Sequence, residues 1–332
     1  MGFAKSNAIC LVRATGSPEI VRVIQKAFML GAGLGTRLRP LTDRLPKPLV
    51  PLFHRPLIEW GMLACRDLGV SEFAINTHHL PEAWTLADEG LKVADWGPGP
   101  WKGANGEVAT RGTWQGCPVD LFHENELLET GGGIKNIADW VGQDDVLIHN
   151  GDIYSSMPLK QLTEAHASSE NLATLALRSD GVAKHVAHAD GQVVDIRAML
   201  GKAEGTHVFS GLYCFSPGLL DYLPAGEKVS VIPAFLELIK AGKLGAVVID
   251  EGIWFDLGNP ESYLAAHRDL ALAEAVHPGA QVAADALVES SVIGPGAEVG
   301  AGAVVRDSVI WPSATVMPGE SLMGEIRMPA AH

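Results

Sequence analysis

Apolar and polar residues follow two different periodic patterns along this chain of 332 residues. The first pattern, of strands and amphipathic helices, covers residues 26–270. The apolar run Ala27–Leu30 predicts a buried strand that ends at a glycine-rich turn, and residues 56–68 have helical spacing up to Gly69. Further strands are expected at 72–76, 119–123 and 146–150, helices at 82–91 and 134–141, and an irregular excursion at 95–116. Strands and helices that alternate over short turns predict an α/β fold with a doubly wound, mostly parallel sheet.

The second periodic pattern begins after about residue 276, where apolar residues recur at every sixth position and occasionally at the fifth. Gly, Ala, Pro, Ser and Asp fill the positions between them, which is the hexapeptide pattern of a parallel β-helix of about three coils. We expect this tail to be structural or to join copies into a homo-oligomer. The chain is thus divided into an N-terminal extension at 1–25, an α/β domain at 26–272 and a β-helix at 273–332. The apolar positions are Val276, Val282, Val288, Ile293, Val299, Val305, Ile310, Val316 and Leu322.

Composition narrows the class of protein. Hydrophobic residues make up 47% of the chain, which is enough for one large domain and a smaller one. A formal net charge of −14 argues against a general nucleic-acid surface. No apolar run reaches the length of a membrane span, and residues 1–25 make a poor signal peptide. The cysteines show no C-x-x-C spacing, so we expect free thiols in a protein of the reducing cytoplasm. From the net charge and the short apolar runs we expect no nucleic-acid and no membrane partner.

Residues 30–48, LGAGLGTRLRPLTDRLPKP, carry the densest chemistry. The glycines expose backbone N–H groups that can face an anion, and Arg37, Arg39 and Lys47 add fixed cations. Lys47 stands between two prolines, which stiffen the backbone around it. A plain strand-to-helix connection would need none of these cations. The spacing matches neither a Walker A loop nor the dinucleotide-binding fingerprint, so a triphosphate is the ligand it favours.

Three polar segments follow three predicted strands: the glycine segment, Asn76–His79 and Asp152. Because ligands of such sheets bind at the carboxyl ends of the strands, we expect these segments to converge on one site. A carboxylate such as Asp152 is a suitable ligand for Mg²⁺, although a loop Asp can also cap the next segment.

The pattern G-x-G-T-R-L-x-P-L-T-x-x-x-P-K-P resembles the sugar-1-phosphate nucleotidyltransferases, also called nucleotide-sugar pyrophosphorylases, over about residues 26–270. The resemblance implies a Rossmann-like catalytic domain at 26–272, and the tail resembles the left-handed β-helices of several such enzymes. In their reaction an oxygen of a sugar-1-phosphate attacks the α-phosphorus of a nucleoside triphosphate (NTP) in line, and pyrophosphate leaves. The attacking phosphate is largely ionised at neutral pH, so alignment and charge neutralisation are required rather than a general base.

By this resemblance Arg37 would bind the β- and γ-phosphates and Lys47 would lie near the α-phosphate. Asp256 belongs to a W-F-D-L-G-N-P run similar to the family's W-x-D-x-G-T-P, whose Asp shares the metal; here Asn259 replaces Thr. Asp152 and Asp256 would therefore hold Mg²⁺ together. The remaining residues implied to contact the nucleotide from the first glycine segment are Leu30, Gly31, Ala32, Gly33, Gly35 and Thr36.

A second glycine turn, Glu129–Ile134 (ETGGGI), occupies the position of the family's L-G-T-A-G-A loop beside the nucleoside and sugar, and it contributes Gly131 and Gly132. The sequence of this segment most resembles that of the N-acetylmuramate-1-phosphate uridylyltransferases and the mannose-1-phosphate guanylyltransferase-like proteins. His78 fits an N-x-H segment of those branches and is a candidate nucleotide contact, or a packing residue. Both GTP and UTP stay open as substrates.

The sugar side carries less information. The pair Ser210-Gly211 resembles part of the family's T-G-I-Y sugar-pocket strand, with Ser in place of Thr. The family's Glu-Lys-Pro lysine has no counterpart, and Arg197 or Lys184 would have to replace it, so the sugar is not identified.

Two other functions compete with an active enzyme. One is a catalytically silent regulatory or scaffolding relative that binds nucleotide sugars, and the other is a dinucleotide-binding dehydrogenase. A pure binder has no need of both Asp152 and Asp256, and the glycine spacing disfavours the dehydrogenase.

Overall fold

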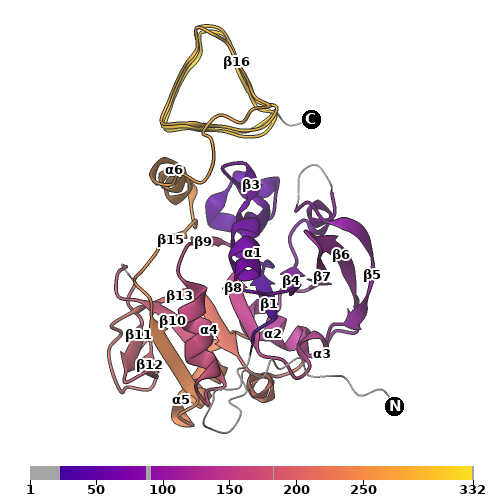
Figure 1. Cartoon of the computed structure of the whole chain (residues 1–332), viewed down its shortest axis with the longest axis vertical. Coiled ribbons are helices and arrows are strands. Elements are labelled where there is room, and N and C mark those ends of the chain that lie inside the picture. Colours follow the sequence, from indigo (N-terminus) through magenta and orange to yellow (C-terminus); the bar gives the residue numbers. More distant parts are fainter. Residues whose placement is uncertain (1–22, 87–90, 182, 331–332) are drawn as a thin grey trace, which may run out of the picture.

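The computed structural model describes residues 23–86, 91–181 and 183–330 (Figure 1). Most of the expected N-terminal extension, residues 1–22, lies outside the described residues. Over the described part of the chain, eleven strands form one mixed sheet in the order β11-β12-β14-β10-β13-β8-β1-β4-β7-β6-β5. The α/β class with a large, mostly parallel central sheet is therefore confirmed.

The centre of this sheet is parallel and brings three strand ends together. β1 (Lys26–Leu30) pairs in parallel with β4 (Glu72–Thr77) on one side and with β8 (Val146–Asn150) on the other. In register, Leu30 lies opposite both Asn76 and Asn150. The three polar segments that follow these strands therefore start from one edge of the sheet, as the sequence predicted.

The remaining strands and helices complete the α/β domain. The remaining strands of the sheet are β5 (Ala94–Lys102), β6 (Val108–Trp114), β7 (Cys117–His123), β10 (Ala173–Arg178), β11 (Val186–Ala189), β12 (Gln192–Ile196), β13 (Val208–Phe215) and β14 (Leu244–Val248). The short strands β2 (Pro51–Leu52), β3 (Arg55–Pro56), β9 (Ile153–Ser155) and β15 (Trp254–Asp256) lie outside it. The α-helices are α1 (Leu57–Asp67), α2 (Glu129–Asn136), α3 (Ala138–Val141), α4 (Leu159–Ala167), α5 (Ile232–Lys240) and α6 (Pro260–Asp269).

Side chains of β1 alternate between two cores because successive residues of a strand point to opposite faces. Ala27 and Met29 enter a core that includes Met62 of α1, whereas Phe28 enters a second core that includes Ile134 of α2 and Phe235 of α5. All six side chains are fully buried. The apolar run Ala27–Leu30 within β1 thus reflects burial on both faces.

The excursion expected at 95–116 is instead an antiparallel hairpin, in which β6 pairs with both β5 and β7. The hairpin could not be predicted from the sequence because Pro98 and Pro100 break the apolar alternation of β5. β5 is the edge strand of the sheet, where a proline costs no ladder hydrogen bond on its free side. The helix expected at 82–91 was also wrong in its described part, which is a short 3₁₀ turn at Pro81–Trp84; residues 87–90 lie outside the described residues.

The second glycine turn was misplaced as well. Gly131, Gly132 and Gly133 lie inside helix α2, which begins at Glu129, and a second helix, α3, follows it. The glycines serve close packing, because a Cβ on Gly132 would lie 2.4 Å from the carbonyl oxygen of Glu227 and one on Gly131 2.8 Å from that of Ser230. The segment 227–230 therefore rests directly on the first turn of α2.

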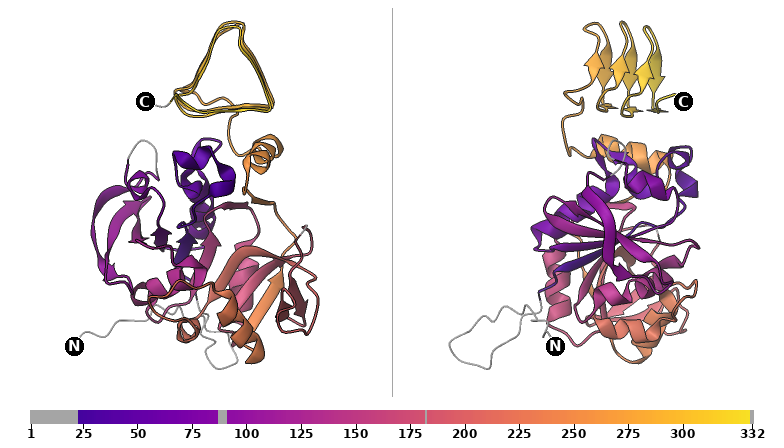
Figure 2. Two further views of the ribbon diagram at one scale, coloured as in Figure 1. Left: turned by 180° about the vertical axis from the view of Figure 1, so that it is seen from behind. Right: turned by 90° about the vertical axis from the view of Figure 1, so that its right-hand side faces the viewer.

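Residues 276–327 form the expected short β-helix, three coils of parallel strands that stack into a triangular prism (Figures 1 and 2). The periodic residues Val299, Val305, Ile310, Val316 and Leu322 are buried inside it. Its flat sides are β16 (Gln281–Val282), β19 (Glu298–Val299) and β22 (Thr315–Val316); β17 (Leu287–Glu289), β20 (Val304–Arg306) and β23 (Ser321–Met323); and β18 (Val292–Ile293), β21 (Val309–Ile310) and β24 (Ile326–Arg327). These sheets fit the left-handed β-helix expected from the sequence.

The β-helix lies beside α6 (Figure 2), and a buried hydrogen-bonded contact fixes it on the α/β domain. Trp311 Nε1 donates to the hydroxyl of Tyr263 at 3.1 Å, and that hydroxyl donates to the carbonyl oxygen of Pro51 at 2.5 Å. Both aromatic side chains are buried. Among the helices that the structure describes, none is long and apolar enough to cross a membrane.

Candidate active site

A cleft of about 500 Å³ opens at the carboxyl ends of β1, β4 and β8. Residues that are far apart in the sequence line it, because neighbouring parallel strands deliver their following segments to the same place. Of the residues expected in the site, the cleft is lined by Leu30, Ala32, Gly33, Gly35, Thr36, Arg37, Lys47 and Asp152.

The first glycine segment wraps one wall of this cleft. Gly35 has a φ of 62°, a left-handed conformation that glycine adopts without strain, and a Cβ there would lie 2.7 Å from Thr42 Cγ2. Its carbonyl oxygen accepts a hydrogen bond from Thr42 Oγ1 at 2.9 Å. A Cβ on Gly33, in contrast, would meet nothing within 4 Å. The protein itself therefore does not require glycine at position 33, which leaves the ligand as a reason for it.

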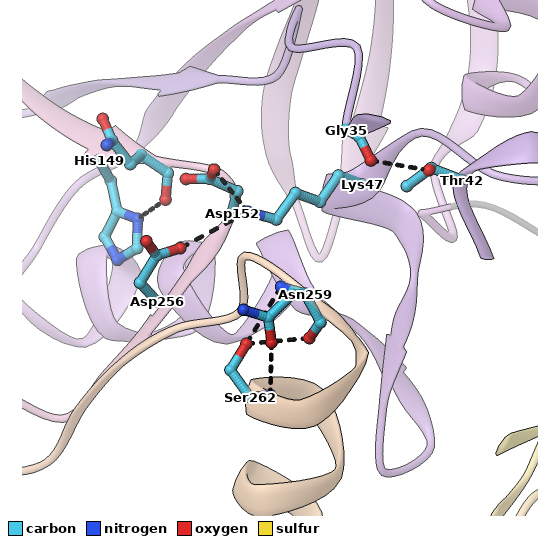
Figure 3. Close-up of polar contacts among 9 residues, drawn as sticks. Gly35, Thr42, Lys47, His149, Asp152, Asp256, Asn259 and Ser262 are labelled. Carbon is cyan, nitrogen blue, oxygen red and sulfur yellow. Dashed lines mark hydrogen bonds and ion pairs between the residues drawn. The ribbon is translucent and has the colours of Figure 1, made fainter. Parts of the chain in front are cut away.

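Lys47 joins the two carboxylates predicted to share a metal (Figure 3). Its Nζ lies 2.8 Å from Asp152 Oδ2 and 3.6 Å from Asp256 Oδ1. Asp152 is the second residue after β8, and Asp256 is brought beside it because β15 pairs with β9 in antiparallel register. The Lys47 side chain is buried, whereas both carboxylates are partly exposed.

This arrangement fits a divalent cation that is shared with phosphate. Asp152 and Asp256 lie beside each other on one ammonium group, and Mg²⁺ is commonly held by one or two carboxylates while water and phosphates complete its shell. Over the described residues, no group of three or more His, Cys, Asp or Glu side chains could hold a metal alone. The donor set therefore suits a metal that arrives with a nucleotide rather than a permanent structural ion.

Arg37, at the end of the glycine segment, lies near the same place. A Cβ on Gly258, two residues after Asp256, would lie 3.4 Å from both terminal nitrogens of Arg37 and 3.3 Å from Asp256 Oδ1. Its guanidinium group is exposed toward the cleft that it lines. Arg39 pairs instead with Asp43 at 3.1 Å. The cleft thus combines a backbone wall, two cations and Asp152, while Asp256 lies beside Lys47 and is not itself one of the lining residues.

The sequence profile described as "Nucleotidyl transferase" matches residues 26–272. The chain belongs to the nucleotidyl transferase family. A mannose-1-phosphate guanylyltransferase of Mycobacterium tuberculosis is 30% identical over 252 residues, which cover 74% of this chain and 64% of the relative. A UTP–glucose-1-phosphate uridylyltransferase of Synechocystis is 25% identical over 257 residues, 73% of this chain and 62% of the relative. The chain therefore spans somewhat less than two thirds of the length of these relatives.

Solved structures share the fold of this nucleotidyl transferase. A putative glucose-1-phosphate thymidylyltransferase from Bacillus anthracis superposes with a TM-score of 0.58 at 17% identity, over 75% of this chain and 97% of that one. A UTP-bound UGPase from Acinetobacter baumannii superposes with a TM-score of 0.56 at 19% identity, over 73% of this chain and 92% of that one. The family resemblance inferred from the glycine segment is confirmed.

Several residues predicted to contact the nucleotide lie behind the wall of the cleft in this nucleotidyl transferase. The N–H of Gly31 donates to Asn76 Oδ1 at 2.7 Å, and His78 Nδ1 donates to the carbonyl oxygen of Glu124 at 2.7 Å. The N–H groups of Gly131 and Gly132 both donate to the carbonyl oxygen of Val229, at 2.8 and 3.0 Å. Direct nucleotide contacts by these four residues stay predictions, and in the structure each supports a segment that does line the cleft.

The predicted sugar residues are similarly occupied. Ser210 is buried, and its hydroxyl donates to the carbonyl oxygen of Ala176 at 2.7 Å. Gly211 has a φ of 81° and leaves room for Asn150, whose Nδ2 would lie 2.6 Å from a Cβ there. Asn150 in turn lines the cleft. The strand that carries Ser210 and Gly211 therefore shapes the cleft through Asn150, and neither Arg197 nor Lys184 is among the residues that line it.

Asn76, Glu129 and Thr130 also line the cleft, and they belong to segments that the sequence placed at the site. Other residues of the cleft were missed from the sequence: Leu34, Pro48, Leu127, Asn150, Ser230 and Gly258. Asn150 could have been found, because it ends a parallel strand that flanks β1. Ser230 carried no signal, since it enters the site only by packing on the glycines of α2.

Proposed function

We propose that this protein is a sugar-1-phosphate nucleotidyltransferase, which condenses an NTP with a sugar-1-phosphate and releases pyrophosphate. The observation that carries the proposal is the contact of Lys47 with Asp152 and Asp256 at the end of a cleft walled by the glycine segment. Nucleotidyl transfer needs alignment and charge neutralisation at the α-phosphorus, and this constellation supplies both.

Each side chain has a role in this proposal. The backbone of Ala32 and Gly33 approaches the nucleotide, and Arg37 neutralises the β- and γ-phosphates that leave as pyrophosphate. Lys47 neutralises charge at the α-phosphate while it holds Asp152 in place. Asp152 and Asp256 would hold Mg²⁺, which when bound supplies a positive charge to the phosphate oxygens of the reacting triphosphate.

For the substrates we propose GTP and mannose-1-phosphate as the first pair to test. The support is that several relatives, including those of Mycobacterium tuberculosis and Arabidopsis thaliana, are named as actual or probable mannose-1-phosphate guanylyltransferases. UTP remains in the test because the Synechocystis relative is named as a uridylyltransferase.

The experiment is a measurement of pyrophosphate release from a panel of NTPs and sugar-1-phosphates with Mg²⁺. We expect turnover with at least one pair and none after Asp152→Asn. Nucleotide binding without turnover for every pair would contradict the enzyme and favour a silent nucleotide-sugar-binding relative.

For the tail we propose a structural role, supported by the buried contact of Trp311 with Tyr263. Light scattering coupled to size-exclusion chromatography would show whether it also joins copies of the chain.

A further inference from the structure

A buried relay of hydrogen bonds joins two separate segments that both line the cleft. The N–H of Gly31 donates to Asn76 Oδ1 at 2.7 Å, and Asn76 Nδ2 donates to Glu124 Oε1 at 2.7 Å. The other carboxylate oxygen, Glu124 Oε2, accepts from the N–H of Leu128 at 2.9 Å. Gly31 directly precedes Ala32, and Leu128 lies between Leu127 and Glu129, all three of which line the cleft.

The central member of this relay is a carboxylate with no exposed surface. Glu124 is 0% exposed and Asn76 3% exposed. Burial raises the pKa of Glu124, while the hydrogen bonds from Leu128 and Asn76 oppose that rise. Since burying a carboxylate costs free energy, an apolar residue would serve better if this position only filled space.

The direction of the hydrogen bonds requires a side chain at position 124 that accepts at both of its oxygens. Both ends of the relay are backbone N–H groups, which can only donate. An Asn side chain between them offers one acceptor and one donor, so the remaining group must accept at both of its ends. An ionised carboxylate does so. An amide there would place two donors face to face at one of the three junctions, even if the Asn76 amide turned over, and a neutral acid would offer one of the two donors only its weaker hydroxyl oxygen.

Helix α2 packs directly on this relay. A Cβ on Gly133 would lie 2.9 Å from Asn76 Nδ2 and 3.0 Å from Glu124 Oε1. The relay therefore fixes where α2 begins, and with it the position of Glu129 and Thr130 in the wall of the cleft.

We propose that ionised Glu124 is a positioning residue that sets the separation between the glycine segment, 30–37, and the segment 127–130. This inference rests on the proposed function, because the ligand held between these two segments is then the NTP. Glu124 does not touch the ligand. It acts through Asn76 and the backbone of Gly31 and Leu128.

The test uses Glu124→Gln and the double variant Asn76→Asp/Glu124→Gln in the full chain. The single variant creates the donor–donor conflict. The double variant removes it, because a carboxylate at position 76 accepts from both the N–H of Gly31 and the new amide, with the same heavy atoms and net charge as the wild type. Glu126→Gln, an exposed neighbour outside the relay, controls for the lost charge.

We expect Glu124→Gln to raise the KM for NTP about tenfold or more, with smaller changes in kcat and in the KM for the sugar-1-phosphate. The double variant is expected to return the KM for NTP to within about threefold of the wild type, and Glu126→Gln to leave it unchanged. An unchanged KM in Glu124→Gln would overturn the proposal. So would a rise in both KM values together with a fall in kcat that the double variant does not reverse, since a purely structural role predicts that.

If Glu124→Gln does not fold, the double variant carries the test alone. A soluble double variant with a KM for NTP near that of the wild type supports the relay, and an insoluble or NTP-insensitive one contradicts it. Absence of NTP binding by the wild-type chain would instead contradict the proposed function, on which the relay's role depends.

Discussion

Lys47 Nζ lies 2.8 Å from Asp152 Oδ2, so a buried ammonium group contacts the carboxylate that is proposed to hold the metal. A lysine ammonium and a divalent cation repel each other, and the repulsion is strong where water is partly excluded. The negative charge of a triphosphate relieves this repulsion. We infer that Lys47 makes metal binding depend on the presence of the nucleotide.

Lys47→Met is therefore expected to raise the affinity of the nucleotide-free protein for Mg²⁺ while it lowers turnover by a factor of about 10² or more. Titration calorimetry with Mg²⁺ alone measures the first effect, and pyrophosphate release the second. Lys160→Met, at an exposed lysine paired with Glu164, is the matched control and should change neither. Weaker Mg²⁺ binding in Lys47→Met would show that the ammonium does not oppose the metal.

Asp256→Asn is expected to shift the Mg²⁺ concentration for half-maximal turnover upward by about tenfold or more, because one of two metal-binding carboxylates is lost. The same titration with Glu261→Gln, an exposed residue in the first turn of α6, controls for the change in charge. An unchanged Mg²⁺ requirement would remove Asp256 from the metal site and leave Asp152 as its protein ligand.

Features that local sequence determines could be predicted, whereas features that depend on contacts between distant segments could not. The strands β1, β4 and β8 could be predicted from their apolar runs, and their polar ends converge because parallel strands share an orientation. Glu124 could not be recognised, since its role arises from the pairing of β4 with β7, which sets Thr77 opposite His123. The glycines of α2 were read as a turn because their cause, contact with segment 227–230, lies about 100 residues away in the chain.

Acid is expected to destabilise the fold through His149. Burial lowers the pKa of this histidine to about 4 in the folded chain, against about 6.5 in an unfolded one. Between those values the unfolded chain binds more protons, so stability is lost as pH falls from about 6.5 toward about 4. At pH 5 His149 alone accounts for about 2 kcal/mol of that loss. The pKa of His267 is also lowered to about 4 by burial, so it adds to the loss over the same range.

Urea unfolding of the wild type and of His149→Leu at pH 7.5 and pH 5 measures this contribution. The difference in unfolding free energy between the two pH values should be smaller in the variant by about 2 kcal/mol. An equal difference in both proteins would mean that His149 is protonated in the folded state. The comparison uses only the pH dependence, so any loss of packing against Gly61 in the variant cancels.

Gly33 and Gly132 are glycines for different reasons: we expect Gly33 to serve ligand binding and Gly132 to serve the packing of the fold. A Cβ at Gly33 would meet nothing within 4 Å, whereas one at Gly132 would lie 2.4 Å from the carbonyl oxygen of Glu227. Gly33→Ala should therefore unfold at the same urea concentration as the wild type and still raise the KM for NTP about tenfold, because the methyl group stands where the nucleotide approaches the backbone. Gly132→Ala should lower the free energy of unfolding by about 1–3 kcal/mol, because backbone must move to admit the methyl group. If Gly33→Ala kept the KM of the wild type, the nucleotide would not pass over Gly33, and the glycine segment would lose its proposed role as the backbone wall of the site.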